Sequence, residues 1–292
     1  MFSGTYTALV TPFRNDQVDD AAFEALIEAQ IAAGIDGIVP VGTTGESPTL
    51  DHAEHLRVIQ RAVEIAKGRC KVMGGTGSNS TVEAVAMTVE AEKVGADAAL
   101  LVAPYYNKPS QEGLFRHFSA IAAASKLPLM LYSIPGRCGI EIAVETVARL
   151  AKACPTIVAI KEAGGAVDRV GALRQVLPDS FDILSGDDSL TLPFIATGAR
   201  GVVSVASNIV PKEVGDMVRA ALAGRLGEAT ALHEKYFSLY KDLFIEPNPV
   251  PTKYALSLQG RMTPDVRLPL CEMSDANKAK LTTTLRSLQL VP

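Results

Sequence analysis

The sequence has few of the residues that build metal sites and disulfide frameworks. Its 292 residues include four cysteines and four histidines. The cysteines are Cys70, Cys138, Cys154 and Cys271, which form no C-x-x-C pair and no zinc-like spacing. The histidines are His52, His55, His117 and His233, which form no H-E-x-x-H motif. We therefore expect reduced thiols and no metal site.

The sequence also lacks an excess of positive charge and a long apolar run. Lys and Arg number 28 against 32 Asp and Glu, which gives a net charge of −4. Because phosphate binding needs a basic face, we expect no nucleic-acid partner. No positively charged leader precedes an apolar stretch, and no apolar run reaches membrane-spanning length. The prediction is a cytoplasmic protein that does not associate with membranes.

What the sequence does contain is a regular alternation of short apolar runs and amphipathic segments. The apolar runs predict strands at residues 5–11, 37–41, 71–75, 98–103, 128–132, 156–160, 181–185 and 201–205. Apolar residues spaced three and four apart predict helices between them, including 20–33, 50–67, 81–94, 113–125 and 142–153. Eight strand-helix units favour a closed (β/α)8 TIM barrel over residues 1–223 rather than an open doubly wound sheet.

The remainder of the chain, residues 224–292, has a different pattern. Helical spacing occurs at 226–244 and 277–288, and no run there reads as a strand. No linker rich in Gly, Ser or Pro separates it from the barrel. We therefore expect a C-terminal helical segment that is packed on the barrel rather than tethered to it.

Lys161 closes an apolar strand just before the glycine-containing loop that starts at Ala163. An ordinary lysine has a pKa of about 10.4, so about 0.04% of it is neutral at pH 7. Burial lowers a lysine pKa by up to about 3 to 5 units. We expect Ile157, Val158 and Ile160 to supply the apolar surroundings that make this amine reactive. A lysine at a strand end is more often a surface residue, so its neighbours decide the interpretation.

The loops after the second and third strands are rich in glycine and hydroxyl groups. Gly42-Thr43-Thr44-Gly45-Glu46 combines two hydroxyls with free backbone N–H groups ahead of a helix, which suits a small carboxylate. No Gly-Lys-Ser/Thr follows, so this loop is not a phosphate-binding P-loop. Gly75 and Gly77 begin a G-x-G pattern, but Ser80 takes the place of the third glycine, which excludes a dinucleotide fingerprint.

Tyrosines and an arginine follow the fourth and fifth strands. Tyrosine hydroxyls relay protons, and an arginine binds a carboxylate through paired N–H groups. In a barrel the loops after the strands form the working face. The side chains expected together on that face are Thr43, Thr44, Tyr106, Tyr132, Arg137 and Lys161. This set predicts a carbonyl-condensing site in which lysine forms an imine with a 2-oxo acid, a reaction that needs no metal.

On these motifs the chain resembles the pyruvate-dependent class I aldolases of the N-acetylneuraminate lyase family, and within it the dihydrodipicolinate synthase branch. The resemblance runs almost end to end. Its motifs are Gly42-Thr43-Thr44-Gly45-Glu46, residues 104–113, residues 132–139, Ile160-Lys161-Glu162-Ala163, residues 184–188 and Glu246-Pro247-Asn248-Pro249. Three residues depart from the common pattern, namely Ser133 for asparagine, Cys138 for threonine and Val203 for isoleucine.

The resemblance implies a role for each of these residues. Lys161 forms the imine with pyruvate, and no other cofactor takes part. Thr44 holds the pyruvate carboxylate, and Tyr132, Thr43 and Tyr106 relay protons.

For the second substrate, the resemblance implies that Arg137 receives the carboxylate of L-aspartate 4-semialdehyde. Gly186 and Val203 line the pyruvate pocket. The implied product is 4-hydroxy-tetrahydrodipicolinate, at the first committed step of lysine and diaminopimelate synthesis.

The resemblance also implies an oligomer, a homotetramer built as a dimer of dimers, in which Tyr105 or Tyr106 reaches a neighbouring subunit. A second site is expected to bind L-lysine as an inhibitor. Its residues are Ser47, His52, His55, Asn79, Glu83 and Tyr105.

Two alternative functions stay open from the sequence. One is another aldolase of the same family, acting on a sugar acid or a 4-hydroxy-2-oxo acid; Arg137 favours a charged amino-acid aldehyde over a polyol. The other is a non-catalytic barrel that senses an oxo acid. The set of Lys161, Tyr132 and Thr43 argues against it, because a binder needs no imine-forming amine beside a proton relay.

Overall fold

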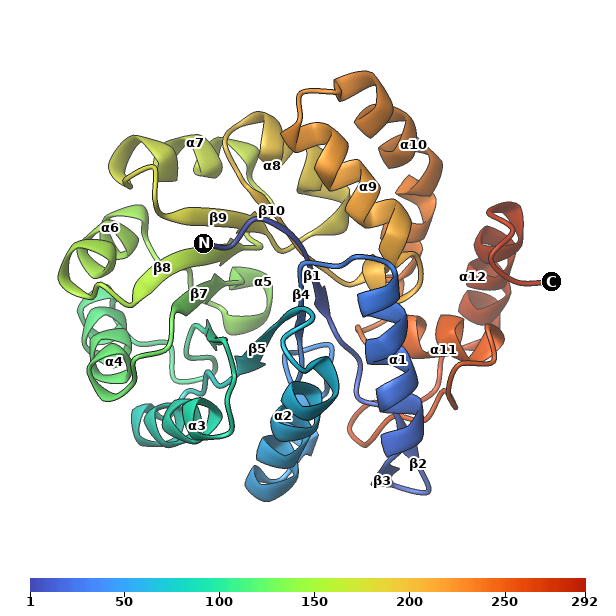
Figure 1. The fold of residues 1–292 in the computed structure, drawn as a ribbon, viewed down its shortest axis with the longest axis horizontal. Coiled ribbons are helices and arrows are strands. Elements are labelled where there is room, and N and C mark those ends of the chain that lie inside the picture. The colour runs from blue at the N-terminus through green and yellow to red at the C-terminus, as the bar shows by residue number, and fades with distance from the viewer.

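The computed structural model describes all residues from Met1 to Pro292. Eight parallel strands form a closed barrel in the order β1-β10-β9-β8-β7-β6-β5-β4 (Figure 1). Their bounds are β1 Gly4–Ala8, β4 Gly37–Val39, β5 Lys71–Gly75, β6 Ala98–Val102, β7 Leu129–Ser133, β8 Ile157–Glu162, β9 Asp182–Ser185 and β10 Gly201–Ser204. The barrel closes where β1 pairs with both β10 and β4. The predicted TIM barrel and all eight predicted strands are confirmed.

Helices surround the barrel. They are α1 Asp20–Ala32, α2 His52–Ala66, α3 Thr81–Lys93, α4 Gln111–Ala124, α5 Pro135–Cys138, α6 Val144–Ala153, α7 Val167–Val176, α8 Thr191–Ala196 and α9 Pro211–Leu222. Side-chain caps determine where several of these helices begin. Asp51 accepts a hydrogen bond from the N–H of Glu54, so α2 begins at His52. Ser80 and Ser110 cap α3 and α4 in the same way.

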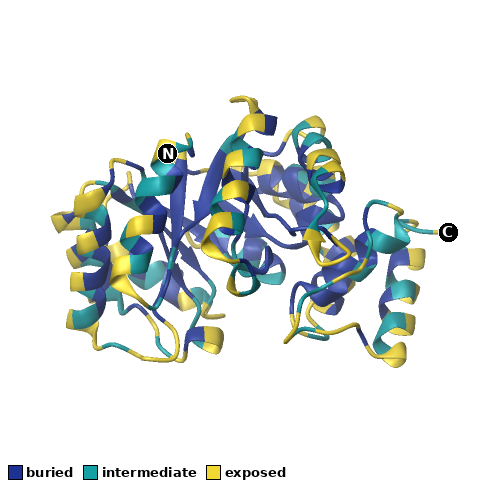
Figure 2. Ribbon diagram, turned by 90° about the horizontal axis from the view of Figure 1, so that it is seen from below, coloured by how far each residue is buried: buried dark blue, intermediate teal, exposed yellow.

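The apolar core has two layers. Thirteen buried residues, including Tyr6, Met130 and Leu184, fill the inside of the barrel. A cluster of 64 buried residues lies between the strands and the surrounding helices. The strands are accordingly buried on both faces, whereas the helices expose their outer faces (Figure 2).

One hairpin was not predicted. β2 (Phe13–Arg14) and β3 (Gln17–Val18) form an antiparallel pair after β1. Asn15 and Asp16 make the turn with positive φ angles of 52° and 62°. An Asn-Asp pair at such a turn is the local signal that could have identified it.

The C-terminal residues form three further helices, α10 Leu226–Asp242, α11 Val250–Leu258 and α12 Asp275–Ser287. α10 packs on α8 and α9, and α12 packs on α10 and α11. Figure 1 shows α11 and α12 at one side of the barrel. α11 was not predicted, because Pro247, Pro249 and Pro251 obscure its helical pattern. The division into a domain of residues 1–223 and a segment of residues 224–292 stays a prediction.

Candidate active site

Lys161 lies on β8 with its side chain inside the barrel. Successive side chains of a strand face opposite sides, so Lys161 shares the inward face with Ala159. Ile157 and Ile160 belong instead to the outer core under the helices. The prediction that these two isoleucines surround the amine is therefore wrong, and of the three residues named only Val158 packs against the inner cluster.

The surroundings of Lys161 come from the two neighbouring strands. Tyr132 on β7 and Leu184 on β9 are its register partners, and both belong to the inner cluster. The Lys161 Nζ atom lies 4.2 Å from the centroid of the Tyr132 ring. The amine therefore packs against an aromatic ring and an aliphatic side chain, and no carboxylate forms an ion pair with it.

Burial lowers the pKa of Lys161 to about 7, although the charge of Asp188 opposes this shift; the charge of Arg137 adds to it. About half of the amine is then neutral at pH 7, where an ordinary lysine is almost wholly charged. Since the neutral amine is the nucleophile, Lys161 has the property that imine formation requires.

Gly186 lies directly against the lysine. A Cβ atom at this position would be 2.7 Å from the Cβ of Ala163 and 3.0 Å from the Cε of Lys161. The position has no room for a side chain, so it must be glycine if Lys161 is to keep its place. Val203 on β10 is fully buried in the inner cluster with Tyr132. Their roles in binding substrate stay predictions.

A cavity of about 230 Å³ opens above Tyr132 at the carboxyl ends of the strands. Thr43, Tyr132 and Arg137 line it, together with Ser47 and Tyr105. Burial raises the pKa of Tyr132 to about 12, against the charge of Arg137 and the nearby Thr43 side chain, so its phenol is protonated at neutral pH. Three of the residues predicted to catalyse or to bind substrate thus meet at one cavity. Lys161 does not line it, and its amine lies against the Tyr132 ring.

Thr44 and Tyr106 do not line this cavity. Thr44 is buried, and its hydroxyl accepts a hydrogen bond from Asn248 Nδ2 at 2.9 Å. Tyr106 is 91% exposed and has a φ of 70°. A single chain therefore does not bring Tyr106 to its own site.

Two polar residues near the site were not given a role from the sequence. Asp188 is buried and accepts hydrogen bonds from the Ser204 hydroxyl and from the backbone N–H groups of Val205 and Ala206. Asn248 holds Thr44 from the C-terminal segment. Both lie in the motifs noted above, and the acidic residues directly after the strand at Ser185 were the available signal for Asp188.

A second cavity, of about 220 Å³, contains five of the six residues predicted to bind lysine. They are Ser47, His52, His55, Glu83 and Tyr105. The sixth, Asn79, does not line it but donates from Nδ2 to the carbonyl of Tyr105 at 3.1 Å. Ser47, Pro48, Gly77 and Tyr105 line both cavities, so the two sites share a wall.

Glu83 is the charged group of this second cavity. Its carboxylate contacts His52 Nε2 and accepts a hydrogen bond from the Ser78 hydroxyl, and these contacts lower its pKa. His55 Nε2 lies 2.7 Å from the carbonyl oxygen of Gly75. Because a carbonyl only accepts, Nε2 carries the proton, and burial lowers the pKa of this imidazole.

No helix in the structure combines the length and apolar character needed to cross a membrane. The predicted cytoplasmic location stays a prediction.

Comparisons with known proteins agree over the whole chain. The model of the dihydrodipicolinate synthetase family matches residues 1–288. A 4-hydroxy-tetrahydrodipicolinate synthase from Geobacter sp. (strain M21) is 52% identical over 291 residues, which cover 100% of both chains.

Two solved structures illustrate the likeness of the fold. The 4-hydroxy-tetrahydrodipicolinate synthase of Methylacidiphilum fumariolicum SolV has a TM-score of 0.98 and 56% identity, covering 99% of this chain and 96% of that one. The enzyme of Cyanidioschyzon merolae, solved with lysine bound, has a TM-score of 0.97 and 41% identity, covering 99% of each chain.

Proposed function

Because the chain belongs to the dihydrodipicolinate synthetase family, we propose that it condenses pyruvate with L-aspartate 4-semialdehyde to give 4-hydroxy-tetrahydrodipicolinate. The observation that carries this proposal is the buried amine of Lys161, whose pKa is lowered to about 7 and which faces the Tyr132 ring without a counter-ion. The reaction class is an aldol-type lyase chemistry that proceeds through a covalent imine.

The covalent intermediates of the proposed reaction form on Lys161 alone. The neutral amine of Lys161 attacks the ketone carbon of pyruvate, and loss of water leaves a protonated imine that accepts electrons. Removal of a methyl proton gives an enamine, whose carbon attacks the aldehyde of the second substrate. The amine of that substrate then attacks the imine carbon. The bond to Lys161 breaks, the ring closes, and the free lysine is regenerated.

We propose for the other side chains the roles that the family resemblance implies. Thr44 and the backbone N–H groups beside it are proposed to bind the pyruvate carboxylate, and Arg137 to bind the carboxylate of the semialdehyde by paired N–H groups. Tyr132, protonated at neutral pH, passes protons with Thr43 at the cavity. Gly186 makes room for the lysine and for pyruvate.

Tyr106 completes the relay only from another subunit. Its side chain is exposed and does not line the cavity of its own chain, which supports assembly as a homotetramer with Tyr106 reaching a neighbouring site. Light scattering of the purified protein measures the assembly. A monomer with full activity would contradict this role for Tyr106.

The second cavity is proposed to bind L-lysine as an inhibitor. Glu83 offers a carboxylate to an ammonium group, and the Cyanidioschyzon merolae enzyme was solved with lysine bound. The wall formed by Ser47 and Tyr105 connects this cavity with the catalytic one. Calorimetry with pyruvate present tests it, and an absence of heat on adding lysine would end the proposal.

Turnover with a panel of acceptors tests the main proposal. Pyruvate consumption is measured with L-aspartate 4-semialdehyde, N-acetylmannosamine and glyceraldehyde, and borohydride reduction with pyruvate traps the imine. Turnover with the semialdehyde alone supports the proposal. Turnover only with a sugar acceptor keeps Lys161 but overturns the substrate, and pyruvate binding without a trapped adduct favours an oxo-acid sensor.

A further inference from the structure

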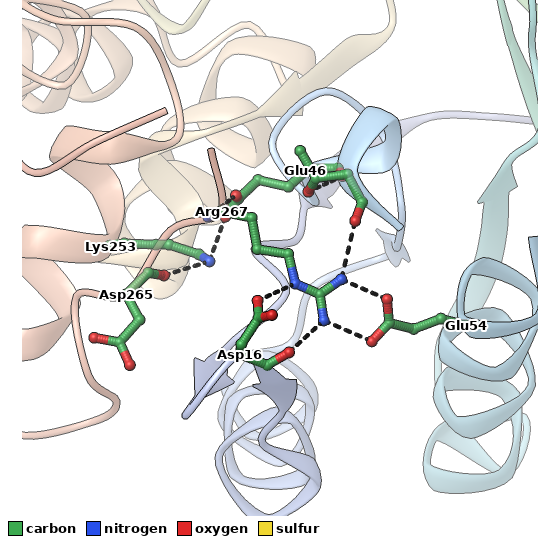
Figure 3. Close-up of polar contacts among 7 residues, drawn as sticks. Asp16, Glu46, Glu54, Lys253, Asp265 and Arg267 are labelled. Atoms are coloured by element: carbon green, nitrogen blue, oxygen red, sulfur yellow. Dashed lines mark hydrogen bonds and ion pairs between the residues drawn. The ribbon is translucent and has the colours of Figure 1, made fainter. Parts of the chain in front are cut away.

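Two buried contacts join the C-terminal segment to the loop Gly42–Glu46, which carries Thr43 and Thr44. Asn248, which lies just before α11, donates a hydrogen bond to the Thr44 hydroxyl. Lys253, in the first turns of α11, forms an ion pair with Glu46 (Figure 3), and both side chains are fully buried. The loop is therefore held by residues from the far end of the chain.

Glu46 is held on both carboxylate oxygens. Oε1 contacts the ammonium of Lys253, and Oε2 accepts a hydrogen bond from the backbone N–H of Arg267 at 3.0 Å. Lys253 also donates to the carbonyl of Asp265 at 2.9 Å and lies 4.1 Å from the centroid of the Phe13 ring. These contacts fix the ammonium from three directions.

The backbone at Glu46 needs such support. Its φ is 55°, in the left-handed region that side chains other than glycine seldom adopt, and Val41 at the other end of the loop has a φ of 50°. Strained backbone of this kind persists where the surroundings over-determine it. The ion pair supplies that constraint two residues after Thr44.

Stability alone does not account for the pair. Removing two charges from water costs about as much as their attraction returns, so well-packed apolar residues would serve as well or better. A buried pair does specify one geometry, because either charge left without the other is strongly disfavoured. Here the geometry that the pair specifies is that of the loop Gly42–Glu46, which lies between Lys253 and the catalytic cavity.

We propose that Glu46 and Lys253 are positioning residues that hold the loop Gly42–Glu46 so that Thr44 meets the substrate carboxylate. This inference rests on the proposed function, in which that carboxylate belongs to pyruvate. Loss of the pair lets Thr44 shift relative to Lys161, which weakens pyruvate binding and slows imine formation. Binding of the second substrate is spared, because Arg137 lies on α5.

The test compares two variants, each of which removes a side-chain contact between the C-terminal segment and the barrel. The double variant Glu46→Gln/Lys253→Met removes both charges with little change in volume. The control is Arg267→Gln, because the Arg267 side chain also joins the segment to the barrel. Its guanidinium contacts Glu54, Asp16 and the carbonyl of Thr49, but not Glu46 (Figure 3).

We expect the double variant to raise the pyruvate KM by about tenfold and to slow borohydride trapping in proportion. Its KM for the semialdehyde stays within about twofold of wild type. Arg267→Gln lowers the thermal midpoint but leaves the pyruvate KM unchanged. If the pair only stabilised the fold, both variants would lower the thermal midpoint and neither would change the pyruvate KM. An unchanged pyruvate KM in the double variant would therefore overturn the inference.

Hydrogen exchange at residues 42–46 gives a readout that needs no substrate. Faster exchange there in the double variant than in Arg267→Gln supports the inference, and equal rates overturn it. A wild-type protein that forms no imine would end the proposed function, while the exchange result would still decide the role of the pair. If the double variant does not fold, Glu46→Gln/Lys253→Gln, which also leaves no unpaired charge, is judged by the same two measurements.

Discussion

Lys161 and Lys253 are two buried lysines of one barrel, and their surroundings are alike in most respects. Each ammonium lies near the face of an aromatic ring, 4.2 Å from the centroid of Tyr132 and 4.1 Å from that of Phe13. Burial lowers the pKa of both, to about 7 for Lys161 and about 8 for Lys253. An arginine adds to the shift in each case.

The difference between the two lysines is the counter-ion. Lys253 contacts the Glu46 carboxylate, which opposes the lowering of its pKa, so most of it is charged at pH 7. Lys161 contacts no carboxylate. The carboxylate oxygens of Asp188 accept hydrogen bonds from Ser204 and from backbone N–H groups, so Asp188 acts on Lys161 only as a nearby charge. Burial and an aromatic neighbour are therefore not sufficient to make a lysine reactive. The amine must also have no paired carboxylate.

Replacing each lysine in turn is the strongest way to break this comparison. Lys161→Ala should lose all borohydride-trapped pyruvate adduct, because the neutral amine is removed. Glu46→Gln/Lys253→Met, which leaves no unpaired buried carboxylate, should keep the adduct at saturating pyruvate, since the Lys253 amine is paired with Glu46 and is not the nucleophile. Mass spectrometry of the reduced protein measures both. An adduct in Lys161→Ala, or one carried by Lys253, would refute the assignment.

The two lysines also differ in how far the sequence could reveal them. Lys161 ends a recognisable strand before a glycine loop, so local pattern and barrel topology were enough to place it beside Tyr132. Lys253 lies in a helix whose pattern prolines interrupt, and its partner Glu46 belongs to the opposite end of the chain. No periodic pattern in the sequence indicates a contact between two residues so far apart in the chain.

The same reasoning explains the error about the surroundings of Lys161. The strand pattern showed that Ile157 and Ile160 are buried, but not on which side of the strand they lie. Ile160 lies in the outer core by alternation, whereas Ile157, which has the same parity as Lys161, lies there because the pairing of β7 and β8 shifts register between Leu129 and Met130. Tyr106 follows a strand as predicted, but its side chain is exposed and does not line the cavity of its own chain, so its role stays a prediction that needs a neighbouring subunit. Long-range packing, rather than residue type, decides these details.

The two nearby arginines offer a second contrast. Arg137→Ala should raise the semialdehyde KM by about 10- to 100-fold, because a charge-assisted hydrogen bond is lost, while the pyruvate imine still forms. Arg267→Ala removes the arginine beside Lys253 and should affect stability rather than either KM. Steady-state kinetics with both substrates measures the outcome. A fall in pyruvate trapping in Arg137→Ala would place this residue with the first substrate instead.

The pH dependence of imine formation sharpens the comparison further. Since the pKa of Lys161 is about 7, the rate at subsaturating pyruvate should rise about tenfold per pH unit below pH 7 and level off above pH 8. The sign follows from the neutral amine, whose fraction increases with pH. Rapid-quench trapping between pH 5.5 and about 9 measures the profile. An ordinary lysine would instead give a rate that climbs to about pH 10.

Cys138 shows the same burial acting in the opposite direction, and it predicts the smallest effect. Burial favours the neutral form of any side chain, which for an amine is the nucleophile and for a thiol is not. The pKa of Cys138 is raised to about 11, and the residue is buried beside Arg137 at the cavity, whereas Cys271 is exposed.

Iodoacetamide at pH 7.5 should therefore label Cys271 and leave turnover within about 20% of the untreated rate, since the Cys138 thiol is almost wholly protonated at that pH. Cys271→Ser is the matched control and should take up almost no label. Rapid inactivation of Cys271→Ser by the reagent would mean that Cys138 is accessible. Burial would then not explain why Cys138 is unreactive, and the same explanation for the reactivity of Lys161 would lose this support.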